Sequence, residues 1–249
     1  MTTIQFNLQQ VHARIAAACQ AAGRDPGTVS LLAVSKTFGP EAVQAGRAVG
    51  QTAFGENYIQ EAVQKITALR QWPDDTHVPL QWHCIGPIQS NKTRLVAEHF
   101  DWVQTVDRLK IAERLSEQRP AGLAPLQVCI QVNVDGGPTK SGVLPQDALQ
   151  LAQQVAALPG LRLRGLMSIP EPAPDFVAAT QVFTRVRALF DALNAEGLGL
   201  DTLSMGMSAD LEAAIHAGST LVRVGSAIFG TRALPIDSLA GSSPSTLRA

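Results

Sequence analysis

Lys36 is the residue of this sequence whose type and position most clearly indicate covalent chemistry. It ends a short, branched and almost uncharged run, residues 31–35, and a Gly39-Pro40 break follows it. Such a run is typical of a strand buried on both faces. Ligands meet reactive side chains at the carboxyl ends of parallel strands, where an amine loses part of its hydration and becomes nucleophilic toward aldehydes. The alternative is a strand-terminal lysine whose amine extends into water.

Two glycine turns near the end of the sequence indicate an anion site. Residues 203–208 (L-S-M-G-M-S) leave one predicted strand, and residues 222–226 (V-R-V-G-S) leave the next. Glycine allows the backbone to approach an anion closely, while hydroxyl and free N–H groups donate hydrogen bonds. We expect Ser208 to be the N-cap of a helix over 209–217. The alternative is that the glycines only form tight turns and the serines only cap helices.

Four other residues have two readings each. Arg223 lies within a strand and faces either the ligand, inside a barrel, or a surrounding helix. Asn57 either bonds a ligand or caps a helix over 57–70. His83, inside a strand, is more often a hydrogen-bonded core histidine than a catalyst. Lys140 is the rival to Lys36 as a covalent amine, but its Gly-Gly-Pro loop gives little desolvation.

The hydrophobic pattern predicts the elements that position these residues. Apolar residues at helical spacing from Ile4 to Ala18 predict an opening helix that ends near Gly23. Eight strands, each followed by a helical segment, are typical of a closed barrel in the α/β class. The predicted strands cover 30–35, 52–54, 80–85, 101–105, 126–132, 162–167, 201–204 and 220–224. The predicted helices between them cover 40–49, 57–70, 91–99, 107–118, 145–157, 175–196 and 209–217.

Composition restricts the class of partner. The 249 residues carry a formal net charge of −1, which gives no electrostatic attraction for nucleic acid. No apolar run approaches membrane-spanning length, so we expect no membrane partner and a small-molecule ligand. The odd number and wide spacing of the three cysteines predict reduced thiols in a cytoplasmic protein. We expect one barrel domain over residues 1–233 and a disordered tail over 234–249.

Taken in order, these segments resemble the pyridoxal phosphate homeostasis protein family, whose members are similar to the N-terminal barrel of alanine racemase. The resemblance extends over residues 5–232. The matching motifs are A-V-S-K-T at 33–37, F-G-E-N-Y at 54–58, W-H-x-I-G at 82–86, Q-S-N-K at 89–92, K-S-G at 140–142, G-L-M at 165–167, S-M-G-M-S-x-D at 204–210 and V-R-V-G-S-A-I-F-G at 222–230. The sequence departs from the family pattern at Gly136-Gly137-Pro138, at Cys84 and at Ala209.

The resemblance implies a single (β/α)8 TIM barrel of the alanine racemase N-terminal type, with an extra N-terminal helix. It implies pyridoxal 5′-phosphate (PLP) as the cofactor, held as a covalent aldimine on Lys36. Ser204, Gly225 and Ser226 would hold the phosphate, Arg223 would face the pyridine nitrogen, and Asn57 and Met167 would line the pocket. The family lacks an established catalytic activity; its members are thought to bind, buffer and deliver PLP, which would make apo-PLP enzymes the partners.

Residue chemistry favours a carrier over a PLP-dependent racemase. A PLP enzyme that uses the ring as a full electron sink pairs the pyridine nitrogen with a carboxylate, whereas a guanidinium disfavours protonation there. Racemases of this type add a tyrosine base from a second domain, and the only tyrosine here is Tyr58. Without that second domain we expect a monomer. A racemase is the first alternative function, and a Schiff-base aldolase that acts through Lys36 is the second.

Overall fold

The computed structural model describes residues 2–72, 78–137 and 140–230, and they form a closed barrel of eight parallel strands in sequence order. The strands are β1 (Ser30–Val34), β2 (Ala53–Glu56), β3 (Gln81–Cys84), β4 (Trp102–Val106), β5 (Leu126–Gln131), β6 (Leu161–Met167), β7 (Thr202–Ser204) and β8 (Leu221–Val224). The predicted barrel is therefore confirmed, including the brief second strand. The tail predicted over 234–249 lies outside the described residues.

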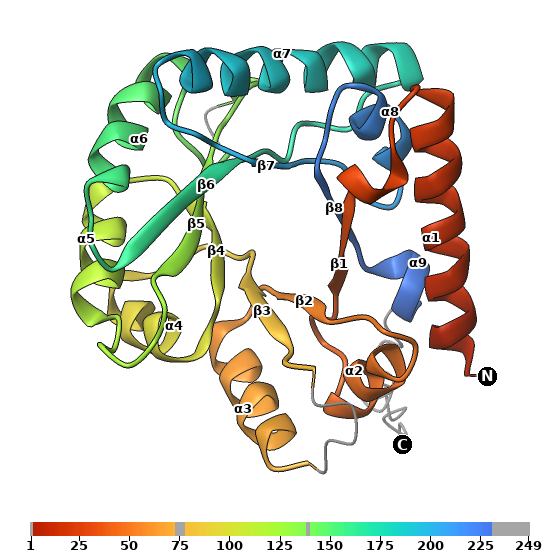
Figure 1. Cartoon of the computed structure of the whole chain (residues 1–249), viewed down its shortest axis with the longest axis horizontal. Coiled ribbons are helices and arrows are strands. Elements are labelled where there is room, and N and C mark those ends of the chain that lie inside the picture. Colours follow the sequence, from red (N-terminus) through yellow and green to blue (C-terminus); the bar gives the residue numbers. More distant parts are fainter. Residues whose placement is uncertain (1, 73–77, 138–139, 231–249) are drawn as a thin grey trace, which may run out of the picture.

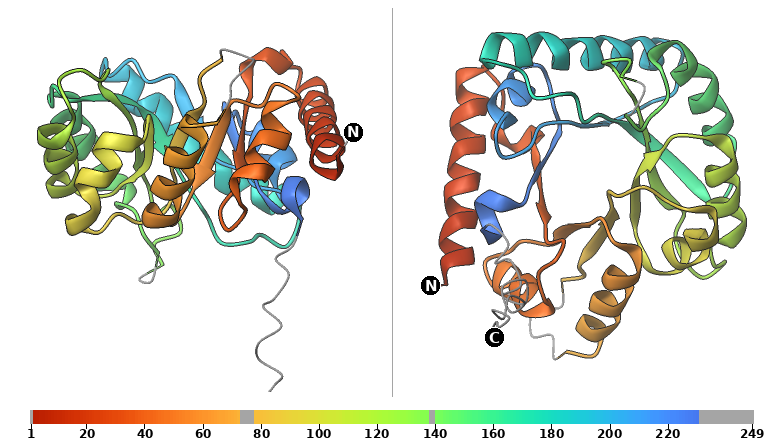
Figure 2. Two further views of the ribbon diagram at one scale, coloured as in Figure 1. Left: turned by 90° about the horizontal axis from the view of Figure 1, so that it is seen from below. Right: turned by 180° about the vertical axis from the view of Figure 1, so that it is seen from behind.

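Helices surround the ring of strands, as Figure 1 shows. They are α1 (Thr3–Ala21), α2 (Pro40–Arg47), α3 (Ile59–Arg70), α4 (Thr93–His99), α5 (Leu109–Gln118), α6 (Ala148–Ala156), α7 (Phe176–Ala195), α8 (Leu211–His216) and α9 (Ser226–Phe229). The additional helix α1 precedes the first strand and lies outside the ring beside α8 and α9, which both views down the barrel show (Figures 1 and 2). Within the described residues no helix is both long and apolar enough to cross a membrane.

The main apolar core lies between the strands and the helices. Leu8, Val11 and Ile15 of α1 are buried there, as their helical spacing predicted. Inside the barrel, Trp102, Cys129 and Met167 form a second, small cluster. Buried polar side chains accompany this cluster, among them His83, Gln104, Ser204 and Arg223. The three cysteines are free and buried, as expected.

The start of α8 corrects one prediction. The helix begins at Leu211, and its N-cap is Asp210 rather than Ser208. The Asp210 carboxylate accepts a hydrogen bond of 2.6 Å from the Met207 N–H, which closes the turn after β7 before the helix starts. Ser208 therefore lies in the loop, where its hydroxyl is available for other contacts.

Candidate functional site

Strand register brings predicted site residues together at the carboxyl-terminal mouth of the barrel. Val34 of β1 pairs with Gly55 of β2. Lys36 and Asn57 each lie two residues beyond this pair, just past the ends of their strands, and are therefore neighbours at the mouth. On the other side of β1, Leu32 pairs with Arg223 of β8. Met167 and Ser204 pair across β6 and β7. The remaining predicted residues, Gly225 and Ser226, directly follow β8 at the same mouth.

Lys36 is exposed, and its amine has no partner among the described residues. The expectation that the protein removes water from this amine is therefore not met by its own side chains. The next residue, Thr37, has a φ of 68°, a left-handed conformation that costs energy for a β-branched residue. Its N–H donates to the Glu61 carboxylate at 2.9 Å, which holds the turn in place. The amine is thus presented on a fixed turn.

A buried ion pair lies beneath this turn. The Lys65 ammonium contacts the Glu56 carboxylate at 2.6 Å and donates to the Ser35 carbonyl at 2.9 Å. The Ser35 hydroxyl donates to the same carboxylate oxygen at 2.6 Å. Burial raises the pKa of Glu56, and the charge of Lys65 opposes the rise. Sequence reasoning missed this pair because no local pattern connects a strand-end glutamate to a lysine on the following helix.

Asn57 presents an unsatisfied group at the mouth. Helix α3 begins after Tyr58 and has no side-chain cap, so the capping alternative for Asn57 is wrong. Its buried Oδ1 has no hydrogen-bond partner within the described ranges. A Cβ on Gly86 would collide with the Asn57 carbonyl oxygen, which explains the glycine there. A ligand that donates a hydrogen bond would satisfy this amide oxygen.

Arg223 points into the barrel, so the alternative of an outward arginine is wrong. The side chain is buried, and it donates to the Ser204 hydroxyl at 2.7 Å and to the Ser168 carbonyl at 3.0 Å. Burial lowers the pKa of Arg223 to about 10, and the charge of Asp210 opposes that change. The guanidinium therefore stays charged at neutral pH.

Ser204 connects Arg223 to a hydrogen-bonded chain along the barrel interior. Its hydroxyl donates to Gln104 Oε1 at 2.7 Å, and Gln104 Nε2 lies 3.0 Å from His83 Nδ1. His83 stacks on Trp102 with ring centroids 5.0 Å apart. Burial lowers the pKa of His83 to about 3, so the ring is neutral. His83 is a core histidine, as favoured from sequence, but sequence reasoning missed Gln104.

The two glycine turns meet as predicted. The hydroxyls of Ser226 and Ser208 lie 3.4 Å apart, one from each turn. A Cβ on Gly225 would lie 3.2 Å from the Val34 carbonyl oxygen, so this backbone runs close against β1. Ser204 Oγ is already used by Arg223 and Gln104. Ser208, which was expected to be the helix N-cap within this turn, thus supplies a hydroxyl to the cup formed by Ser208, Gly225 and Ser226.

Lys140, the rival amine, has a partner. Its ammonium contacts the Glu171 carboxylate at 3.0 Å, and about a quarter of its side chain is exposed (28%). An amine held in an ion pair must break that contact before its nitrogen can attack a carbonyl carbon. The structure therefore favours Lys36 over Lys140 as the reactive lysine.

Comparison with known proteins defines the class. The family model for the alanine racemase N-terminal domain matches residues 6–233, which is the whole barrel. A curated protein of Pseudomonas aeruginosa, "Pyridoxal phosphate homeostasis protein", is 60% identical over 232 residues, or 93% of this chain and 97% of that protein. The chain therefore belongs to the pyridoxal phosphate homeostasis protein family, as its motifs indicated.

Solved structures agree with this assignment. An unknown protein from Bifidobacterium adolescentis is 36% identical, with a TM-score of 0.84 over 91% of this chain and 94% of that chain. PipY of Synechococcus elongatus, solved with PLP bound, is 35% identical, with a TM-score of 0.74 over 87% of this chain and all of the PipY chain (100%).

Proposed function

We propose that this protein binds PLP at the carboxyl-terminal mouth of the barrel and serves in the cytoplasm as a carrier that buffers the cofactor and delivers it to apo-enzymes. The observation that carries the proposal is the Lys36 amine, which has no partner in the described part of the chain and lies at the same mouth as the Ser208–Ser226 hydroxyl pair. PLP joins an aldehyde and a phosphate on one ring, so it needs both an amine and an anion site. The homeostasis name of the relatives and the PLP bound to PipY support the assignment.

Each part of the mouth fits a group of the cofactor. The Lys36 amine would attack the aldehyde carbon, forming a C=N bond and releasing the aldehyde oxygen as water. Ser208, Ser226 and the Gly225 backbone would hold the phosphate. The unsatisfied Asn57 Oδ1 would accept a hydrogen bond from a ring substituent such as a hydroxyl. Met167 would line the pocket beneath the ring.

The charge of Arg223 favours a carrier over a strong catalyst. We place its guanidinium next to the pyridine nitrogen and Ser204 behind it, bonded to its Nη1. A charged group there opposes protonation of the ring, so the cofactor would withdraw electrons weakly. Tyr58, the only tyrosine in the sequence, is 52% exposed, which does not provide the positioned second base of a racemase.

Absorbance and reductive trapping test the proposal. Purified protein supplied with PLP should absorb visible light, lose that absorbance on borohydride reduction, and yield a phosphopyridoxyl group on the Lys36 peptide. The Lys36→Ala variant should retain its circular dichroism and lose the visible band, while Lys140→Ala should keep both. A full chromophore in Lys36→Ala would contradict the assignment of the reactive amine.

A second assay separates the alternative functions. Incubation with L-alanine should give no appreciable D-alanine on chiral chromatography, because the second base is missing. Sustained racemisation would replace the carrier with a racemase. A protein that stays colourless and gains no mass with PLP, but forms a reducible adduct with a sugar-phosphate aldehyde, would be a Schiff-base aldolase.

A further inference from the structure

A second cavity opens at the opposite, amino-terminal mouth of the barrel. Its volume is about 580 Å³, within the range of small-molecule sites. The first residues of six strands line it, which are Ser30, Ala53, Gln81, Trp102, Thr202 and Leu221. The site proposed above uses the other ends of the same strands, so the two sites are distinct.

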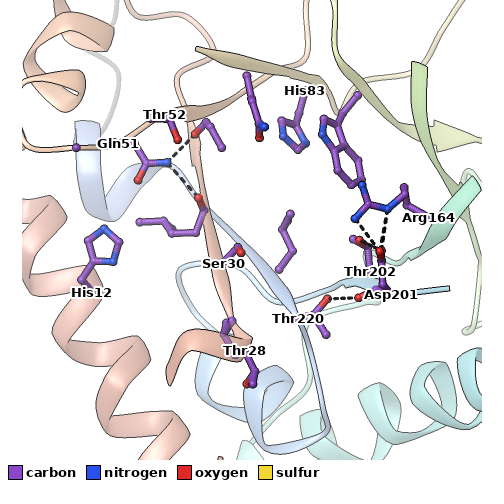
Figure 3. A pocket seen from close by; sticks show the side chains of 17 residues that line it. His12, Thr28, Ser30, Gln51, Thr52, His83, Arg164, Asp201, Thr202 and Thr220 are labelled. Carbon is purple, nitrogen blue, oxygen red and sulfur yellow. Dashed lines mark hydrogen bonds and ion pairs between the residues drawn. The ribbon is translucent and has the colours of Figure 1, made fainter. Parts of the chain in front are cut away.

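Some hydrogen-bond donors that line the cavity have no acceptor among the described residues. His83 lines it and is 2% exposed, and its buried Nε2 has no partner in the part of the chain that the structure describes. The hydroxyls of Ser30 and Thr52, which also line it, have no partners among the described residues. Figure 3 shows His83, Ser30 and Thr52 around the same space. An unsatisfied buried donor is costly, so His83 Nε2 requires a ligand or water, whereas the more exposed Ser30 and Thr52 hydroxyls are free to bind either.

The interior hydrogen-bonded chain determines which His83 nitrogen carries the proton. Arg223 can only donate, so the Ser204 hydroxyl must direct its own hydrogen to Gln104 Oε1. The Gln104 amide NH2 then donates to His83 Nδ1, which must be the acceptor. The proton of the neutral imidazole therefore lies on Nε2. The two ring nitrogens point away from each other, so Nε2–H points away from Gln104, and His83 itself lines the cavity at the amino-terminal mouth.

The charge of the cavity restricts its ligand. Among the described residues that line the cavity, the cationic side chain is that of Arg164. It is paired with Asp201 at 2.7 Å, and its guanidinium carbon lies 4.8 Å from the Trp102 ring centre. Among the described residues that line the cavity there is no lysine and no unpaired arginine that could neutralise a phosphate. The Trp102 indole borders the cavity, but His83 stacks on it and the Arg164 guanidinium lies against it, so only its edge is open to a ligand. A neutral ring with acceptor oxygens and hydroxyl groups matches this lining, whereas its phosphate ester does not.

We propose that the cavity at the amino-terminal mouth binds a small, neutral, hydroxylated heterocycle of about nucleoside size, with an acceptor oxygen on His83 Nε2–H. Its hydroxyl groups would contact Ser30 and Thr52, and its ring would pack near Trp102. This site is independent of the PLP site, since none of its ligand contacts involves Lys36 or the cup.

Uridine and uridine 5′-monophosphate form a matched pair of probes, because they differ only in the phosphate. Titrations of the full-length protein without added PLP would follow the indole N–H signals by NMR, with the Trp102 signal assigned from Trp102→Phe. Uridine should shift the Trp102 signal saturably and leave that of Trp72 unchanged. Calorimetry should show at least tenfold weaker binding of the monophosphate.

Variants test the assigned contacts. His83→Phe keeps a flat ring without the donor and should weaken uridine binding at least tenfold, while Thr52→Val should weaken it several-fold. If His83→Phe does not fold, Thr52→Val and Ser30→Ala together provide the test. Thr184→Val, at an exposed threonine on α7, is the matched control and should bind as wild type.

Three outcomes would overturn the proposal. The first is the absence of a saturable shift with either uridine or inosine, which would leave a water-filled cavity. The second is equal affinity for uridine and its monophosphate, and the third is unchanged uridine affinity in the variants at Ser30, Thr52 and His83. The PLP chromophore, which depends on Lys36, would be unaffected by any of these results. Failure of this proposal is therefore distinguishable from failure of the proposed function.

Discussion

At the scale of single residues, the turn that carries Lys36 depends on neighbours outside the proposed PLP contacts. The left-handed Thr37 is held by Glu61, and Ser35 is held from below by Glu56 and Lys65. Both partners of the buried ion pair are almost fully buried, with 3% and 0% of their side chains exposed. Such a pair adds little net stability over an apolar pair, but loss of one partner leaves a buried charge. Its role is to fix the turn.

We predict that Lys65→Met lowers the free energy of unfolding by about 3 kcal/mol, because Glu56 loses its partner in a buried site. The double variant Glu56→Gln, Lys65→Met should recover at least half of that loss. Urea denaturation followed by circular dichroism measures both values. Lys110→Met, at an exposed position on α5, is the control and should be nearly neutral. Equal losses in the single and double variants would contradict the argument.

At the scale of elements, the additional helix α1 supports the loop of Ser208 and the turn of Ser226, which form the proposed phosphate cup. Asn7 donates to the Ile228 carbonyl of α9 at 2.9 Å. Arg14 donates to the Ser208 carbonyl at 3.1 Å and pairs with Glu212 of α8. The loop of Ser208 and the turn of Ser226 are therefore both bound to one helix, which explains why this helix lies beside α8 and α9 (Figure 1).

We predict that Arg14→Ala weakens PLP binding roughly fivefold, because the loop of Ser208 loses a hydrogen bond that orders it. A fivefold change corresponds to about 1 kcal/mol, which is typical for the loss of one hydrogen bond. Absorbance titration of the unloaded protein measures the affinity. The matched control is Arg94→Ala, which removes an exposed ion pair on α4 and should bind PLP like wild type. Wild-type affinity in Arg14→Ala would show that α1 does not order the cup.

At the scale of the whole molecule, the barrel separates an apolar layer from a polar interior. The layer between strands and helices supplies the main core, while the interior holds the chain from Arg223 to His83. Such a chain is tolerated because each member bonds the next, and it runs between the two mouths. Closure of the ring brings β6 against β7, where a Cβ on Gly165 would collide with the Thr202 backbone.

We predict that Gly165→Ala destabilises the barrel by about 3 kcal/mol, because the added carbon forces β6 and β7 apart. For a chain of this size, that loss lowers Tm by roughly 10 °C in a thermal unfolding experiment. Gly122→Ala is the control, since a Cβ there meets nothing within 4 Å. An equal change in the two variants would show that closure does not depend on this glycine.

The order and type of the elements could be predicted from the sequence, because hydrophobic periodicity records which face of each segment is buried. The strands were placed within about two residues of their bounds, and Lys36 was placed just past the carboxyl end of β1. The glycine turns were also recognisable, since they need few long-range contacts. Ser208 was misassigned because capping depends on where the helix begins, and Asp210 closes that turn.

Only the tertiary structure determines the contacts that depend on which strands are neighbours. The inward direction of Arg223, the Glu56–Lys65 pair and the chain from Ser204 to His83 join residues between 9 and 100 positions apart. The cavity at the amino-terminal mouth likewise exists only because the first residues of distant strands converge when the ring closes. The physical reason is that local sequence patterns record burial, whereas partners across a barrel are set by register and closure.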